Sequence, residues 1–154
     1  MQSNKVNKTN SGKMSALELY RADSLSSLKL PFAANRISAG FPSPADDFLE
    51  TSIDLNKHLI KNPSTTFYGR VTGNSMVDAG INDGDLLIID KSLQPTTNRI
   101  AVCFIDGEFT VKRIKVEKET VWLIAENKDY KPIKVTSDND FIVWGIVINS
   151  IKYF

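Results

Sequence analysis

Short runs of β-forming residues alternate with clusters of turn residues in the part of the chain that follows residue 65. β-branched and aromatic residues favour strands, and the Gly, Asn, Asp and Pro residues between them favour reversals of chain direction. The runs are TFYGRVTG, DLLIID, RIAVCFI, EFTVKRIKV, TVWLIAE, KPIKVT and FIVWGIVINSIKY. Their spacing predicts a mainly β fold, built as a compact, coiled and mostly antiparallel β domain.

The dipeptide Asp106-Gly107 is the strongest hairpin signal in the chain. Both central residues of a two-residue hairpin turn need a positive φ, which Asp tolerates and Gly adopts freely. The turn assigns Lys112 to the second strand of the hairpin, where period-two alternation puts its side chain on the same face as Thr110 and Ile114. Lys112 is therefore predicted to have the driest setting among the cations of this strand.

The residues before the β-rich part differ from it in composition and in the pattern of apolar residues. Residues 1–15 are polar, rich in Asn, Ser and Lys, and carry too little apolar surface to offset the entropy of ordering them. Residues 16–39 carry scattered apolar residues without a sustained period. We expect the first stretch to be a flexible arm and the second to form no core of its own. A helix-turn-helix DNA-binding domain does not fit in this length.

Two short helices are predicted between this segment and the β-rich part. The sequence SPADD, with a cap residue, a first-turn proline and acidic residues, predicts a helix over residues 44–50. The sequence DLNKHLIK, closed by an Asn-Pro pair, predicts a second helix over residues 54–61. Leu55, Leu59 and Ile60 are expected on the buried side of this second helix.

The chain length, the net charge and the length of the apolar runs limit the classes of protein to which the chain can belong. A chain of 154 residues is long enough for one domain with a sizeable core. Its 19 Lys and Arg residues against 18 Asp and Glu residues give a net charge of +1, so the charge does not indicate a surface that follows nucleic-acid phosphates. The apolar runs are shorter than the roughly 18 residues of a membrane span, and no signal-peptide pattern opens the chain. We expect a cytoplasmic protein.

Cysteine and histidine each occur once, as Cys103 and His58. A lone cysteine forms no internal disulfide, and one cysteine with one histidine is too few for a zinc site. We therefore expect no metal and no cofactor. Cys103 lies in the apolar run AVCFI and is predicted to be a small core residue.

Ser75 lies in the segment GRVTGNSMVDAG, and its position has two interpretations. The sequence from Ser75 to Asp78 fits the S-x-x-[DE] capping box, in which the hydroxyl accepts from backbone N–H groups of a helical turn. Alternatively, Ser75 is a nucleophile on a tight turn whose own amides stabilise an oxyanion. The second interpretation requires a base elsewhere in the chain.

His58 and Lys112 are the candidate bases. His58 would need a carboxylate such as Asp54 or Asp78 to orient it, and its spacing favours an ordinary histidine on a helix surface. Lys112 can serve if desolvation lowers its pKa and keeps it neutral, although a strand lysine is more often solvated or an edge guard against aggregation. The residue pattern alone leaves the base open.

The motifs around these residues resemble the UmuD/LexA family of self-cleaving serine peptidases, and the UmuD branch most. They are GNSM around Ser75, the DGDLLIID that follows, DGEFTVKRI around Lys112, and AGFPSP around Gly40. The resemblance covers about residues 37–154, with the motifs in the family's order and at family-like separations. It implies a β domain of the LexA C-terminal and signal-peptidase type, with short helices near its N-terminus.

The resemblance also implies roles for individual residues. Ser75 would be the nucleophile, Lys112 the general base, and Ala39-Gly40 the peptide bond that is cut. The amides of Ser75 and Asn74 would form the oxyanion hole. Cleavage would remove residues 1–39 as a flexible N-terminal arm and leave residues 40–154 as the serine peptidase and dimerisation domain.

The partners implied by the resemblance belong to the SOS response to DNA damage. A RecA filament on single-stranded DNA would stimulate the cut, and the trimmed homodimer would then act as accessory subunit of an error-prone, UmuC-type translesion DNA polymerase. No direct sequence-specific DNA binding and no membrane association are expected. The alternatives are a LexA-like or phage-type self-cleaving repressor, a signal peptidase, and a non-catalytic partner-binding module with the same fold.

Overall fold

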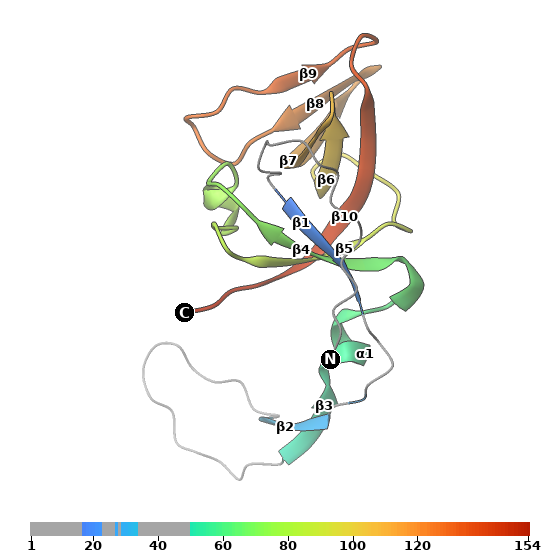
Figure 1. Ribbon diagram of the computed structural model, residues 1–154, viewed down its shortest axis with the longest axis vertical. Coiled ribbons are helices and arrows are strands. Elements are labelled where there is room, and N and C mark those ends of the chain that lie inside the picture. Colours follow the sequence, from blue (N-terminus) through green and yellow to red (C-terminus); the bar gives the residue numbers. More distant parts are fainter. Residues whose placement is uncertain (1–16, 23–26, 28, 34–49) are drawn as a thin grey trace. The chain divides into compact units, whose positions relative to one another are not determined.

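The structure is a computed structural model that describes residues 17–22, 27, 29–33 and 50–154 (Figure 1). Its contacts divide the chain into two units, of which the first comprises residues 1–22 with 62–154 and the second residues 23–61. The first unit contains an eight-stranded sheet, and the second contains a two-stranded sheet and a short helix.

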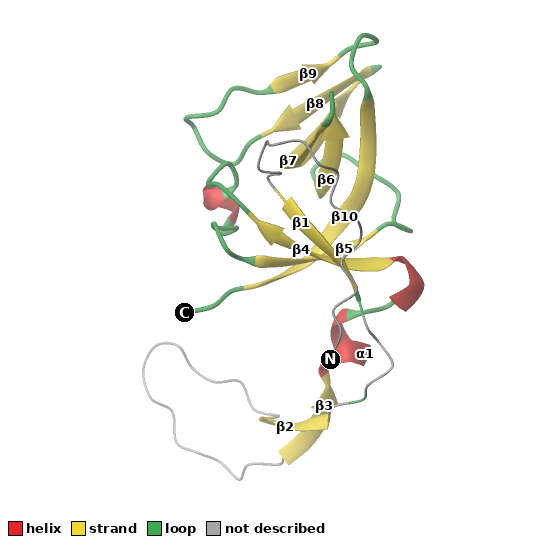
Figure 2. Cartoon of the chain, in the orientation of Figure 1, coloured by secondary structure: helices red, strands yellow, loops and turns green. Residues whose placement is uncertain are grey.

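Strands make up most of the first unit (Figure 2). They are β1 (Leu17–Arg21), β4 (Thr66–Val71), β5 (Leu86–Asp90), β6 (Ile100–Ile105), β7 (Glu108–Glu117), β8 (Thr120–Ile124), β9 (Ile133–Val135) and β10 (Phe141–Ile151). Their order in the sheet is β1-β4-β5-β10-β6-β7-β8-β9, and every neighbouring pair is antiparallel. Each predicted β-rich run contains one of these strands, so the predicted mainly β, antiparallel fold is confirmed.

The strand β10 joins the two halves of the sheet. Its residues 141–146 pair with β6, and its residues 146–151 pair with β5. The pairing register shifts between Val143 and Gly145, and such irregularities bend a strand and increase its twist. A Cβ atom at Gly145 would lie 2.7 Å from Ile89 Cγ2, so only glycine allows β10 to approach β5 this closely.

The hairpin predicted at Asp106-Gly107 is confirmed. Asp106 has φ 49° and Gly107 has φ 91°, as the turn requires. The strands β6 and β7 pair on either side of it, with Ala101 opposite Lys112. The hairpin therefore holds Lys112 in a central strand of the sheet, beside a small residue.

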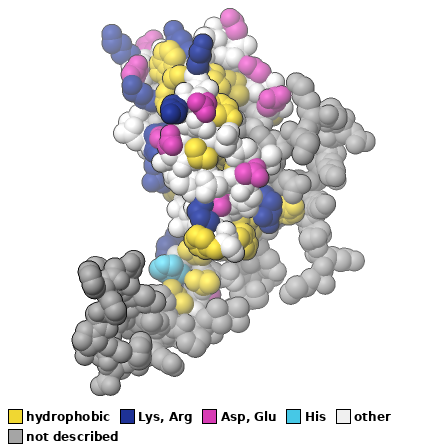
Figure 3. Space-filling model, turned by 90° about the vertical axis from the view of Figure 1, so that its left-hand side faces the viewer, with side chains coloured by type: hydrophobic (Ala, Val, Ile, Leu, Met, Phe, Trp, Pro, Cys, Tyr) yellow, Lys and Arg dark blue, Asp and Glu magenta, His cyan; other side chains and the backbone are white. Residues whose placement is uncertain are grey.

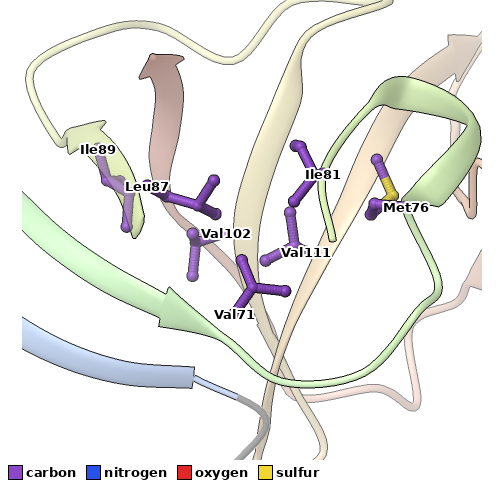
Figure 4. Packing of buried hydrophobic residues seen from close by; sticks show 7 residues of the cluster. All are labelled: Val71, Met76, Ile81, Leu87, Ile89, Val102 and Val111. Atoms are coloured by element: carbon purple, nitrogen blue, oxygen red, sulfur yellow. The ribbon is translucent and has the colours of Figure 1, made fainter. Parts of the chain in front are cut away.

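Two hydrophobic clusters pack on the sheet, and β6 contributes to both because its successive residues point to opposite faces. The first cluster consists of Val71, Met76, Ile81, Leu87, Ile89, Val102 and Val111 (Figure 4). The second consists of Ala101, Cys103, Ile114, Leu123 and Ile146. Met76 directly follows Ser75 and Val111 directly precedes Lys112, so burial of the first cluster fixes the backbone beside both residues.

The strand β1 was not predicted from the sequence. It pairs with β4 from Leu17 opposite Val71 to Arg21 opposite Phe67, and forms one edge of the sheet. An edge strand is held by backbone hydrogen bonds on one side and does not need a sustained apolar period. The expectation that residues 16–39 form no core of their own is consistent with β1, which instead extends the edge of the eight-stranded sheet.

The second unit pairs β2 (Lys29–Ala33) with β3 (Glu50–Asp54), and β3 leads into α1 (Leu55–Leu59). The helix predicted over residues 54–61 is thus confirmed but is shorter. Its burial was partly mispredicted, because Leu55 is 46% exposed whereas Ile60, just beyond the helix, is buried. A helix of little more than one turn presents no continuous apolar stripe.

Residues 44–49 of the helix predicted over 44–50 lie outside the described residues, and Glu50 begins β3 instead. Residues 1–16 of the predicted flexible arm also lie outside the described residues.

Candidate active site

Ser75 lies on the loop between β4 and β5, in a segment that we call the serine loop (residues 72–80). The segment contains the 3₁₀ turn η2 (Val77–Ala79), whose N-cap residue is Met76 and which has no side-chain cap. The amide of Asp78 donates to the carbonyl oxygen of Glu126 at 2.8 Å and not to Ser75. The capping-box interpretation of Ser75 is therefore wrong.

The serine loop is fixed on both sides of Ser75. Gly73 has φ 98°, which only glycine adopts readily, and its amide donates to Asp83 Oδ1 at 2.7 Å. Met76 is 2% exposed and packs into the first hydrophobic cluster. Ser75 itself is partly exposed. The hydroxyl is consequently held at the surface by a buried residue and a hydrogen-bonded glycine turn.

Lys112 is buried beside Ser75, with 6% of its surface exposed. Its Nζ donates to Ser75 Oγ at 3.0 Å, to Thr110 Oγ1 at 2.7 Å and to the carbonyl oxygen of Val111 at 3.0 Å. The predicted dry setting of Lys112 on the face of Thr110 is confirmed. The structure thus brings together two residues that lie 37 positions apart in the sequence.

The surroundings of Lys112 favour its neutral form. Burial lowers the pKa of Lys112, because removal of water penalises the charged amine. Among the described residues, no carboxylate forms a salt bridge with it. Burial also raises the pKa of the neighbouring Cys103 to about 12, so the thiol is protonated at neutral pH and supplies no negative charge. A neutral lysine is a proton acceptor.

A cavity of about 30 Å³ opens beside Ser75. It is lined by Val71, Thr72, Gly73, Ser75, Met76, Thr110 and Val111. One water molecule needs roughly 10–15 Å³ on this measure. The cavity therefore has room for a methyl group or for one or two water molecules, and excludes a large side chain.

His58 is exposed on α1, as predicted for a histidine on a helix surface. Asp54, one of its two candidate carboxylates, caps that helix by accepting from the amides of Asn56 at 3.1 Å and Lys57 at 3.4 Å. Asp54 also accepts from Ser27 Oγ at 2.8 Å. This carboxylate is therefore engaged in capping, which removes one of the two arrangements in which His58 was considered as a base.

The other residues and sites considered in the sequence are Cys103, Ala39-Gly40, a metal site and a membrane span. Cys103 is fully buried in the second hydrophobic cluster, so its prediction as a core residue is confirmed. Ala39 and Gly40 lie outside the described residues. Within the described part of the chain, no group of three His, Cys, Asp or Glu side chains is placed to hold a metal ion. No helix of that part is long and apolar enough to cross a membrane.

The loop between β8 and β9 makes contacts that have no signal in the sequence. Asn127 Nδ2 donates to the carbonyl oxygen of Asn74 at 2.9 Å, and the Tyr130 hydroxyl donates to Asn74 Oδ1 at 2.6 Å. The segment NKD has the composition of a turn, but nothing in it indicates a partner more than fifty residues away. These contacts arise only when the folded sheet brings the two loops together.

Comparison with known proteins identifies the family. Residues 31–148 match the family Peptidase S24-like. Protein MucA of Salmonella typhimurium is 40% identical over 123 residues, which cover 79% of this chain and 84% of MucA. Protein ImpA of Escherichia coli is 49% identical over 121 residues, which cover 79% of this chain and 82% of ImpA. LexA repressor 1 of Pseudomonas syringae pv. tomato is 39% identical over 118 residues, which cover 76% of this chain and 58% of the repressor. The chain therefore belongs to the Peptidase S24-like family, as a UmuD-type member of the self-cleaving LexA/UmuD serine peptidases of the SOS response.

Proposed function

We propose that the chain cuts its own backbone between Ala39 and Gly40, with Ser75 as the nucleophile and Lys112 as the general base. The observation that carries this proposal is the 3.0 Å distance between Lys112 Nζ and Ser75 Oγ, at an amine whose pKa is lowered by burial. Membership of a peptidase family supports it independently. No histidine and no metal is needed.

The first step is acylation of the serine. A neutral amine has two hydrogens, and Thr110 Oγ1 and the carbonyl of Val111 are placed to accept them, so the lone pair faces Ser75 Oγ. Lys112 takes the hydroxyl proton as Oγ attacks the carbonyl carbon of Ala39. The C–N bond then breaks, and the Lys112 ammonium returns the proton to the leaving amine of Gly40.

The second step releases the two fragments. Water attacks the ester that joins Ser75 to Ala39, and Lys112 accepts a proton from this water. The ester bond breaks, Ser75 recovers its hydroxyl proton from Lys112, and the products are residues 1–39 and 40–154. Both residues of the dyad stay in the larger fragment, so the cut acts as a switch.

The shape of the site supports Ala39 as the residue before the cut. The cavity of about 30 Å³ beside Ser75 matches a methyl side chain. Within the described residues, neither the Ser75 amide nor the Asn74 amide donates a hydrogen bond, so both are available to a developing oxyanion. Such donors typically contribute about a 10²-fold to 10³-fold rate enhancement.

The proposed partners follow from the same family membership. We propose that the chain acts as a cytoplasmic homodimer, is stimulated by a RecA filament on single-stranded DNA, and serves a UmuC-type translesion polymerase after cleavage. Positive and negative side chains are interspersed on the face in Figure 3, in keeping with a net charge of +1. This mixture supports recognition through protein partners and not through direct tracking of DNA phosphates.

The proposal is tested by incubating the purified full-length chain at neutral and at alkaline pH and measuring the product masses. Ser75→Ala and Lys112→Ala are the matched controls. The expected result is one new amino terminus at Gly40, formed faster at alkaline pH and absent from both variants. Cleavage at another bond, or continued cleavage in Ser75→Ala, contradicts the proposal.

A LexA-like repressor is the second candidate, favoured by the 39% identity to LexA repressor 1. It predicts sequence-specific binding of operator DNA by the full-length chain, which a gel-shift titration measures. The translesion role predicts no such binding and instead predicts that the trimmed chain co-purifies with a polymerase of the UmuC type.

A further inference from the structure

The loop between β8 and β9 holds the serine loop at three points. The Asp78 amide donates to the carbonyl of Glu126 at 2.8 Å, Asn127 Nδ2 donates to the carbonyl of Asn74 at 2.9 Å, and the Tyr130 hydroxyl donates to Asn74 Oδ1 at 2.6 Å. Two of the three bonds converge on one residue, which directly precedes Ser75.

The bond from Asn127 has a consequence for the direction of the next amide. The carbonyl of Asn74 and the N–H of Ser75 belong to one peptide unit, which is planar and trans, so the two groups point in opposite directions. A donor that fixes the carbonyl therefore also fixes the direction of the Ser75 N–H. A hydrogen bond to that carbonyl also polarises the peptide and strengthens its N–H as a donor.

Asn127 is itself held in place. Its Oδ1 accepts from the Asp129 amide at 2.9 Å, and its carbonyl accepts from the Tyr130 amide at 3.1 Å. Because Oδ1 is occupied by an N–H donor, Nδ2 is the atom that faces the Asn74 carbonyl. This assignment follows from the donors and acceptors on each side.

The same loop is tied to the strand that carries Lys112. Arg113, the next residue on β7, forms an ion pair with Glu126, and its Nη1 donates to the carbonyl of Asn98. The loop between β8 and β9 thus connects the two elements of the site, namely the serine loop and β7. None of these contacts involves Lys112 Nζ or Ser75 Oγ.

We propose that Asn127 is a positioning residue for self-cleavage, whose Nδ2 aims the Ser75 N–H at the oxyanion by holding the Asn74 carbonyl. Tyr130 assists by fixing the Asn74 side chain. This inference rests on the proposed function, because it assigns a role within the same reaction. It concerns stabilisation of the oxyanion and not the basicity of Lys112, and the two roles have different kinetic signatures.

The test compares the pH dependence of self-cleavage in Asn127→Ala with that of the wild-type full-length chain. The expected result is a maximal rate at high pH that is lower by about tenfold to a hundredfold, because misdirected donors lose transition-state stabilisation. The midpoint of the pH profile, which reports the pKa of Lys112, stays unchanged. Tyr130→Phe, which removes one hydroxyl, lowers the rate less than Asn127→Ala.

Two further variants separate positioning from folding. Asn127→Asp keeps the volume and the oxygen that accepts from the Asp129 amide, and replaces the Nδ2 donor with a charged carboxylate oxygen that cannot donate to the Asn74 carbonyl, so its maximal rate also falls. Asn139→Ala is the matched control: Asn139 Oδ1 likewise accepts from a nearby amide, that of Thr136 at 2.8 Å, together with the Thr136 hydroxyl at 3.1 Å, and its Nδ2 donates to Asp106 at 2.7 Å. It is expected to cleave at the wild-type rate.

The amide resonance of Ser75 provides a measurement that does not depend on cleavage. Its proton and nitrogen shifts are expected to move in Asn127→Ala and to stay in place in Asn139→Ala. An unmoved resonance, or a wild-type rate in Asn127→Ala, overturns the positioning role while self-cleavage stands. A rate loss with a shifted midpoint and a lowered melting temperature also overturns it, because it indicates general damage. A wild-type chain that does not cleave overturns both proposals.

Discussion

Asp90 and Lys112 are both buried ionisable side chains, with 1% and 6% of their surfaces exposed. Asp90 accepts hydrogen bonds from Asn62 Nδ2 at 2.8 Å, from Thr65 Oγ1 at 2.9 Å, and from both the amide and the hydroxyl of Ser92 at 2.8 and 2.7 Å. Burial by itself would raise the pKa of this carboxyl, but the hydrogen bonds outweigh burial and the pKa of Asp90 is lowered.

Lys112 has the opposite balance. Burial is the main influence on it and lowers its pKa, and its three hydrogen-bond partners are all uncharged oxygens. The fold therefore stabilises the charged form of Asp90 and the neutral form of Lys112. Burial alone therefore does not make a side chain structural or reactive. The groups that remain in contact with it decide which form is kept, and hence what the side chain can do.

Removal of the Lys112 amine is the strongest test of this contrast. Lys112→Met keeps a long apolar side chain and removes the base, so the self-cleavage rate is expected to fall by about 10²-fold to 10⁴-fold. The free energy of unfolding is expected to stay equal or to rise, because the penalty for burying an amine disappears. Product masses and denaturant titrations measure the two quantities. A large loss of stability would show that Lys112 is a structural residue.

Removal of the Asp90 carboxylate should have the complementary effect. Asp90→Ala leaves buried donors without an acceptor and is expected to lower the free energy of unfolding by about 3 kcal/mol. The cleavage rate of the folded fraction is expected to stay unchanged. Asp138→Ala, at an exposed carboxylate, is the matched control and should change stability little. Equal stability of the two variants would contradict the structural role of Asp90.

Both groups should make stability rise with pH, because both pKa values are lowered on folding, but in different windows: acidic for Asp90 and alkaline for Lys112. The lowered pKa of Asp90 adds stability above its ordinary value of 3.8, and this contribution is lost as the pH falls through the lower folded value. Between the lowered folded pKa of Lys112 and its ordinary value of 10.5, the unfolded chain binds a proton that the folded chain does not. Stability contributed by this group therefore rises with pH across that window.

Denaturant midpoints of the wild type and of Lys112→Met, measured over this alkaline window, check the sign. The midpoint of the wild type is expected to increase relative to that of Lys112→Met as the pH rises. A difference that is constant with pH would mean that Lys112 titrates alike in the folded and unfolded chains.

The smallest expected effect concerns His58. His58→Gln should change the cleavage rate by less than about twofold and leave stability within about 0.5 kcal/mol, because His58 is an exposed side chain on α1. The same mass measurement applies. A loss of cleavage rate comparable to that of Lys112→Met would indicate that His58 is the base. Lys112 would then have no catalytic role.

The fold was predictable where its signals were local. Each β-rich run from residue 66 onward contains a strand, and Asp106-Gly107 forms the expected hairpin, because strand alternation and turn chemistry depend on neighbouring residues. β1, β2 and β3 escaped prediction, because LELYR, KLPFA and ETSID are short segments without the sustained β-forming pattern of the later runs. Leu55 was expected to be buried and is exposed, because its helix ends after little more than one turn.

The site was predictable to a lesser degree. Alternation placed Lys112 on a dry face, but only the resemblance of the motifs singled it out as the partner of Ser75, since a separation of 37 residues contains no distance information. Their catalytic roles and the cut at Ala39-Gly40 stay predictions. The hydrogen bond from Asn127 to Asn74 and the bond from Asn62 to Asp90 had no signal in the sequence, because each joins polar residues that are far apart in the chain.

The central claim, that Lys112 is neutral when it takes the proton of Ser75, is tested most directly by titrating the Lys112 side-chain amine by NMR in Ser75→Ala. The midpoint of this titration is compared with the midpoint of the cleavage pH profile of the wild-type chain. The pKa of Lys112 is expected to lie below the ordinary value of 10.5 and close to the cleavage midpoint. A Lys112 that titrates like an exposed lysine, or a cleavage profile with a clearly different midpoint, would contradict it.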